Sequence, residues 1–82
     1  MNPRVKKVKA NEKNYTLEIE FENGEMGVFD VSKYLNIGIF KELIDKNKFK
    51  KVYVRFGTVV WESEQDLCPD TVYEDSVKEG SV

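Results

Sequence analysis

The sequence predicts an α+β fold: an antiparallel sheet of about five strands, short helical pieces between the third and fourth strands, and a C-terminal helix. Apolar and polar residues alternate in short segments of the first and second halves, whereas apolar residues between them have helical spacing. Eighty-two residues, 40% of them hydrophobic, suffice for one small core. We therefore expect a single domain over residues 1–78 and a frayed tail over residues 79–82.

The first two strands carry the clearest pattern. Residues 4–10 predict the first strand, and the spacing of three between Val5 and Val8 indicates a bulge within it. Residues 15–21 alternate apolar and polar side chains without a break, which is typical of a strand with one solvated face.

Two hairpins are expected. The Asn23-Gly24 pair favours a two-residue type I′ turn before a third strand over residues 25–30, because such a turn needs positive φ at both central positions. Later in the chain, residues 52–56 alternate again. Gly57 then permits a tight reversal into a partner strand over residues 58–61.

The helical pieces are short. The four apolar residues of the segment Ile39–Ile44 have helical spacing, and Asp45 is placed to cap a further turn over residues 46–49. Pieces of this length need a sheet beneath them to be stable. The last helix is expected from Asp70 to about Val77, with Pro69 at its first position.

Charge is distributed in blocks of alternating sign. Residues 1–9 carry four positive charges and no negative one, whereas residues 10–30 carry one positive and six negative. Residues 31–60 carry seven positive and two negative, and residues 61–82 carry one and seven. Such blocks suggest opposed faces, although the basic first strand could also pair with the acidic second strand. The net charge of −2 argues against nonspecific nucleic-acid binding as the main role.

Several chemistries lack the residues that they require. The single cysteine, Cys68, excludes an internal disulfide framework, and the absence of histidine makes a zinc site improbable and excludes a Ser-His-Asp triad. The five glycines are dispersed, so no phosphate-binding glycine loop is present. No apolar run approaches 18 residues, and the basic N-terminal segment has no apolar stretch behind it, so we expect no secretory signal. We expect a cytoplasmic setting, no membrane association, no cofactor and no catalytic or metal-binding residue.

An acidic segment near the only tryptophan is the best candidate for chemistry. Trp61, Asp66, Asp70 and Tyr73 are a possible interaction surface. The carboxylates could hold a hard cation or act as acid and base, or they could serve only to cap the last helix. Trp61 is either a core side chain or a partly exposed platform beside Tyr73.

A possible basic patch follows the helical pieces. With Tyr53 interleaved, it could touch phosphates or a stacked base, or its lysine stems could simply cover apolar surface. No recognition helix accompanies it, so direct nucleic-acid binding is not expected. The patch consists of Lys46, Lys48, Lys50, Lys51 and Arg55.

Five short stretches resemble landmarks of a small bacterial family, domain of unknown function 2442. They are Pro3-Arg4-Val5, Phe21-Glu22-Asn23-Gly24, Val28-Phe29-Asp30-Val31, Thr58-Val59-Val60-Trp61 and Asp66-Leu67-Cys68-Pro69-Asp70-Thr71-Val72-Tyr73. The resemblance covers residues 3–76 and implies an α+β fold on an antiparallel sheet, with no established activity and no catalytic residue to carry over. Some relatives carry a helix-turn-helix domain, and others are encoded beside a small protein in what resembles a toxin–antitoxin arrangement. Cys68 departs from the family, where aspartate is commoner, so helix capping there is expected to be weaker.

These observations favour a non-catalytic protein-interaction module. The resemblance adds that it could be a small regulatory or antitoxin-like component of a two-protein system, whose partner is another small protein or a second copy of the chain. Two alternatives stay open. One is an accessory domain in a DNA-associated transcriptional regulator, and the other is a carboxylate-based enzyme or metal binder.

Overall fold

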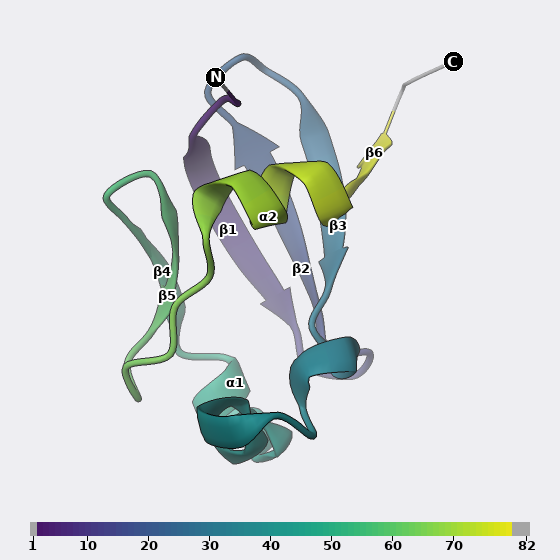
Figure 1. Ribbon diagram of the computed structural model, residues 1–82. Helices are drawn as coiled ribbons and strands as arrows, with labels where there is room; N and C mark the ends of the chain where they lie inside the picture. Colours follow the sequence, from purple (N-terminus) through teal and green to yellow (C-terminus); the bar gives the residue numbers. More distant parts are fainter. Residues whose placement is uncertain (1, 80–82) are drawn as a thin grey trace.

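A four-stranded antiparallel sheet and a two-stranded hairpin form the frame of the protein (Figure 1). The computed structural model describes residues 2–79. The large sheet has the order β1-β2-β3-β6, and β4 pairs only with β5. The elements are β1 (Val5–Asn11), β2 (Thr16–Phe21), β3 (Met26–Asp30), the 3₁₀ helices η1 (Ser32–Tyr34) and η2 (Gly38–Ile44), α1 (Lys46–Phe49), β4 (Val52–Arg55), β5 (Thr58–Trp61), α2 (Pro69–Asp75) and β6 (Val77–Glu79).

The α+β class and the antiparallel pairing are confirmed, but the strands are arranged differently from a single five-stranded sheet. The last described strand, β6, joins the large sheet beside β3, and β4 lies alongside β1 without a ladder. The backbone N–H of Val5 donates to the carbonyl of Gly57, 2.9 Å away, and this bond holds the hairpin tip at the start of β1. The predicted bulge is confirmed, because the β1–β2 register shifts between Val5 and Lys7.

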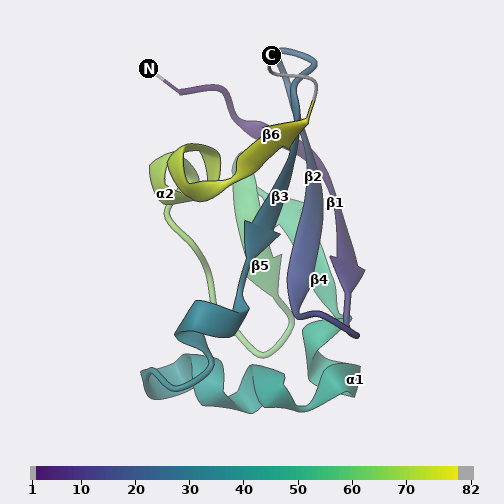
Figure 2. The same ribbon diagram turned by 90° about the vertical axis from the view of Figure 1, so that its right-hand side faces the viewer.

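One side of this frame is packed and the other is solvated. Helix α2 crosses the packed side, while η1, η2 and α1 close one end (Figures 1 and 2). The alternating residues of β2 explain the division: Leu17, Ile19 and Phe21 are completely buried, whereas Glu18 is exposed. The buried hydrophobic cluster consists of Val5, Leu17, Ile19, Phe21, Phe29, Val31, Leu35, Leu43, Phe49, Val59, Trp61, Leu67 and Val72.

The turn between β2 and β3 corrects the sequence prediction. Its loop has three residues, and the Gly24 N–H donates to the carbonyl of Phe21, 3.0 Å away. Gly24 has a φ of 90°, whereas Asn23 is not among the described non-glycine residues with positive φ. This is a type I turn followed by a left-handed glycine rather than a type I′ turn. The Asn23 side chain instead accepts a hydrogen bond from the Glu25 N–H, 3.0 Å away.

The middle segment follows a 3₁₀ period rather than an α-helical one. Phe40 and Leu43, three residues apart, face inward, whereas Ile39 and Ile44 are 61% and 52% exposed. The four apolar residues therefore do not share one buried face, as α-helical spacing had indicated. The cap is confirmed, because the Asp45 carboxylate accepts a hydrogen bond from the backbone N–H of Asn47, 2.9 Å away.

The C-terminal helix is shorter than predicted. It begins at Pro69, as expected, but Ser76 has a ψ of 139° and ends it, so Val77 opens a strand instead of closing a helix. The backbone of Glu79, the first residue of the expected tail, pairs with Met26, and residues 80–82 lie outside the described residues. No helix among residues 2–79 is long and apolar enough to cross a membrane.

Candidate functional site

Trp61 is a core residue. Its side chain is completely buried, and its indole Nε1–H donates to the carbonyl of Phe49, 2.9 Å away. Its ring also lies close to the rings of Phe40 and Phe49, at centroid distances of 6.4 and 6.0 Å. The interpretation of Trp61 as an exposed platform is therefore wrong, because no surface of the side chain remains for a partner.

The other three residues of the predicted surface, Asp66, Asp70 and Tyr73, have different structural positions. Asp66 is exposed and bridges Val60 at the outer edge of β5. Asp70 lies in the first turn of α2, and the half-buried Tyr73 faces the β2–β3 turn. The capping interpretation of Asp66 is wrong, because residue 68 is the N-cap of α2 and makes no side-chain capping bond. Within residues 2–79, no three acidic or cysteine side chains gather in a way that could hold a metal ion.

The predicted basic patch is divided among several places. The Lys46 ammonium donates to the carbonyl of Glu12 and lies 5.0 Å from the ring centroid of Tyr15. Lys48 forms an ion pair with Glu42, at 3.2 Å. Lys50 and Lys51 are exposed. Arg55 lies near the hairpin tip, with its guanidinium over the ring of Phe56.

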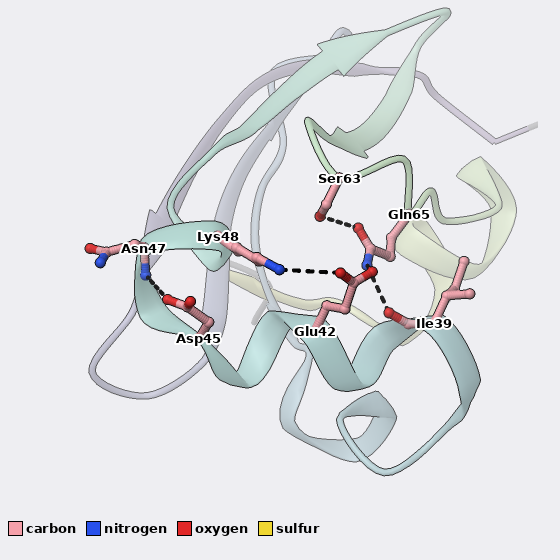
Figure 3. A network of polar contacts seen from close by, with 7 residues as sticks. All are labelled: Ile39, Glu42, Asp45, Asn47, Lys48, Ser63 and Gln65. Carbon is pink, nitrogen blue, oxygen red and sulfur yellow. Dashed lines mark hydrogen bonds and ion pairs between the residues drawn. The ribbon is translucent and has the colours of Figure 1, made fainter.

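A surface hollow of about 220 Å³ adjoins part of this set, between Lys48, Lys51, Glu62 and Ser63. Figure 3 shows the polar network beside it, in which the buried side chain of Gln65 reaches η2. The Gln65 amide donates to the carbonyl of Ile39, 2.7 Å away, and accepts from the Ser63 hydroxyl. These bonds connect the loop after β5 to η2. Every buried side-chain polar atom of the described residues has a hydrogen-bond partner.

The first two charge blocks, residues 1–9 and 10–30, meet on one face of the large sheet. Lys7 pairs in register with Glu20, and Lys9 pairs with Glu18, on the solvated side of the large sheet. The ammonium of Lys6 lies 3.6 Å from the Glu20 carboxylate. The alternative pairing of the basic first strand with the acidic second strand is thus the arrangement that the structure shows.

A polar cluster joins α2 to the β2–β3 turn. The Tyr73 hydroxyl donates to the Glu25 carboxylate, 2.6 Å away, and the Asn23 amide donates to the same oxygen. These two bonds lower the pKa of Glu25, with a smaller contribution from the positive charge of Lys78, while partial burial opposes them. The same bond raises the pKa of Tyr73 above its ordinary value, because it stabilises the protonated phenol.

The two edges of the large sheet differ in exposure. β4 lies along the outer edge of β1, and lysines occupy exposed positions of β1. At the opposite edge, no described strand pairs with the outer side of β6. Val77 on β6 is 74% exposed, and Met26 on the neighbouring strand β3 is 42% exposed. The edge at β6 is therefore the one where a partner strand could add.

The tip of the β4–β5 hairpin is a feature that the sequence interpretation missed. Phe56 is 81% exposed and lies in the turn, although residues 52–56 predicted it as the last residue of a strand. Its φ of 52°, followed by a φ of 74° at Gly57, makes this tip the type I′ turn. The sequence does contain a signal for this exposed turn: Phe56 lies directly before Gly57, where the two alternating segments meet.

Together these features define a small α+β protein whose distinctive surfaces are an open sheet edge and an exposed aromatic turn. The chain belongs to the family described as protein of unknown function (DUF2442), which matches residues 5–78. The family resemblance found in the sequence is thereby confirmed. No curated protein and no solved structure matches the chain.

Proposed function

We propose that the chain is a non-catalytic protein-interaction module, the regulatory or antitoxin-like member of a two-protein system. In this proposal, a small partner protein adds a strand to the sheet at β6. The observation that carries the proposal is the open edge of the large sheet, with Val77 74% exposed. An edge of this kind presents unpaired backbone groups, which another strand can satisfy with main-chain hydrogen bonds.

The side chains of β6 support this role. Lysine on an edge strand ordinarily discourages pairing when its ammonium projects into solvent. The Lys78 ammonium instead lies 3.9 Å from the centroid of the Tyr73 ring and donates to the carbonyl of Tyr73. It is thus turned back onto α2, and the apolar Val77 remains at the edge.

The test is isolation of the tagged full chain from its own host cell, followed by native mass spectrometry. We expect one small protein in stoichiometric amount, and its loss from Val77→Lys, which places a charge at the edge. Ile37→Lys is the matched control, because Ile37 is 56% exposed and lies in the segment between η1 and η2. Both substitutions should change stability by less than about 0.5 kcal/mol, since both side chains are exposed. Absence of a stoichiometric companion, or a companion held equally by Val77→Lys, would reject the proposal.

A further inference from the structure

The tip of the β4–β5 hairpin contains a residue type that its turn disfavours, and no contact with the core accounts for it. Type I′ turns favour Asn, Asp or Gly, because an L-residue with a bulky side chain is strained at positive φ. Phe56 nevertheless holds a φ of 52° and leaves 81% of its surface exposed. A residue that is strained and solvated without a compensating contact to the core is typical of a functional position.

Two arginines lie at this turn, one against the Phe56 ring and the other against Gly57. The guanidinium carbon of Arg55 lies 5.0 Å from the Phe56 ring centroid. The stem of Arg4 packs against Gly57 so closely that a Cβ at Gly57 would lie 2.7 Å from the Arg4 Cδ. Neither arginine forms an ion pair within residues 2–79. The tip therefore carries an exposed apolar ring, and the two arginines that lie at the turn have no acidic partner in the described chain.

Two carboxylates without such a partner lie on α2 and are linked through Asn2 to the segment that contains Arg4. The Asn2 amide donates to Asp70, 3.3 Å away, and to Glu74, 3.1 Å away, on the exposed side of α2. Asn2 precedes Arg4 by two residues, so their Cα atoms are at most about 7 Å apart. Neither carboxylate forms an ion pair in the described part of the chain. Figures 1 and 2 both show the hairpin tip level with α2.

This end of the molecule thus has a positive half and a negative half, joined by the segment that contains Asn2 and Arg4. We propose that it is a self-association surface that binds a second copy of the chain. A two-fold axis between the halves would bring Arg4 and Arg55 of each copy to Asp70 and Glu74 of the other, and would remove Phe56 from water. A surface that carries both complementary halves can form a closed, isologous dimer.

A protein surface fits these observations better than a nucleic acid. A polyanion binds where several cations neutralise several phosphates, and it is repelled by neighbouring carboxylates. Here Asp70 and Glu74 lie at the same end of the molecule as the two arginines, linked through Asn2, and the charges of both signs are complementary to a surface that also carries both. The proposed surface is also separate from the edge at β6, so the two proposals can fail independently.

Sedimentation velocity of the full chain from micromolar to millimolar concentration tests the proposal. We expect a monomer–dimer equilibrium that weakens with added salt. Phe56→Asn should weaken the dimer by about tenfold or more, since the ring is its apolar centre. Because asparagine suits the turn, the thermal midpoint of this variant should be no lower than that of the unchanged chain, and a weaker dimer then cannot be ascribed to unfolding.

Charge reversal gives a more specific signature. Arg55→Glu and Glu74→Lys should each prevent self-association, because like charges would face each other twice in the dimer. An equimolar mixture of the two variants should associate as a heterodimer, because both contacts become attractive. Lys33→Glu is the matched control, since Lys33 is exposed and lies in η1, outside the surface. It should dimerise like the unchanged chain.

Four outcomes would overturn this inference. One is a strict monomer at millimolar concentration, and another is a dimer that Phe56→Asn or Arg55→Glu leaves intact. The third is binding of a single-stranded oligonucleotide that Arg55→Glu abolishes in the absence of any dimer, which would assign the surface to nucleic acid. Val77→Lys should leave the dimer intact. Loss of the dimer in that variant would place the contact at the sheet edge instead.

Discussion

The β2–β3 and β4–β5 hairpins of this protein form turns that do not match the residues at their tips. The β2–β3 hairpin contains Asn23-Gly24, a favoured type I′ pair, yet it closes with a three-residue loop. The β4–β5 hairpin contains Phe56-Gly57 and forms the type I′ turn. The difference shows which constraint decides loop length.

In both hairpins the core sets the register and the turn conforms to it. The observed β2–β3 register pairs Leu17 with Phe29, so both side chains face the core. A two-residue loop at Asn23-Gly24 would shift the pairing by one residue and turn Phe29 toward solvent. In β4–β5, Val54 pairs with Val59 and Arg55 pairs with Thr58, which leaves a two-residue loop. The residues at the tip must then adopt positive φ, even where one of them is phenylalanine.

The largest expected loss of stability comes from the core side of the β4–β5 hairpin. Trp61→Ala should lower the free energy of unfolding by about 3–5 kcal/mol, because it leaves a cavity and removes the indole bond to the Phe49 carbonyl. Urea denaturation measures the loss. Tyr53→Ala on the neighbouring strand is the control, since Tyr53 is 38% exposed and faces outward. Equal losses for the two variants would contradict the assignment of the faces.

The glycines of the two turns give the next effect. Gly24→Ala and Gly57→Ala should each cost about 1–2 kcal/mol, because alanine is strained at φ values of 90° and 74°. Gly24 has open space around it, whereas a Cβ at Gly57 would displace the stem of Arg4. Gly57→Ala should therefore be the more costly in thermal or urea unfolding. A smaller loss at Gly57 than at Gly24 would show that Arg4 does not pack there in solution.

Local patterns predicted the parts of the fold that depend on neighbours in sequence. The alternation in β2, the bulge after Val5 and the Asp45 cap could be read from a few consecutive residues, because their causes lie within those residues. The strand β6 could not, since three residues carry no period. It exists because Ser76 ends α2 beside the free side of β3.

The candidate site was harder to predict for a related reason. Residue types identified Trp61 as a possible platform, but exposure depends on which long-range partners cover a side chain, and the Phe40 and Phe49 rings cover this one. Phe56 was expected to close an alternating strand, whereas it lies in the turn. Its exposure follows from the turn register, which in turn follows from the core pairing of Val54 with Val59.

Adding an asparagine at one turn and removing the asparagine of the other should have smaller and opposite effects on stability. Phe56→Asn should raise the free energy of unfolding by about 0.5–1 kcal/mol, because asparagine adopts positive φ with less strain than phenylalanine. Asn23→Ala should lower it by about 0.5–1.5 kcal/mol, since the Asn23 side chain would no longer accept from the Glu25 N–H. Both values come from urea denaturation. A loss of stability in Phe56→Asn would mean that the ring packs on its own chain.

The smallest expected effect is a change of pKa at the turn between β2 and β3, which has no counterpart at the β4–β5 tip. Tyr73→Phe should bring the pKa of Glu25 back toward its ordinary value of 4.5, because the phenol is the main group that stabilises the carboxylate. Titration of the Glu25 carboxyl carbon by NMR measures the shift. Phe21→Leu is the control, because it alters the ring packed edge-on against Tyr73 but leaves the phenol in place.

The same bond makes stability depend on pH at both ends of the scale. The lowered pKa of Glu25 contributes stability that is present above pH 4.5 and is lost as the pH falls through the folded-state value. The raised pKa of Tyr73 contributes stability that is present below pH 10.0 and is lost as the pH rises above it. In Tyr73→Phe the alkaline loss should disappear and the acid loss should shrink, since Asn23 still donates to Glu25. An unchanged alkaline limb would show that the phenol and the carboxylate are not bonded in solution.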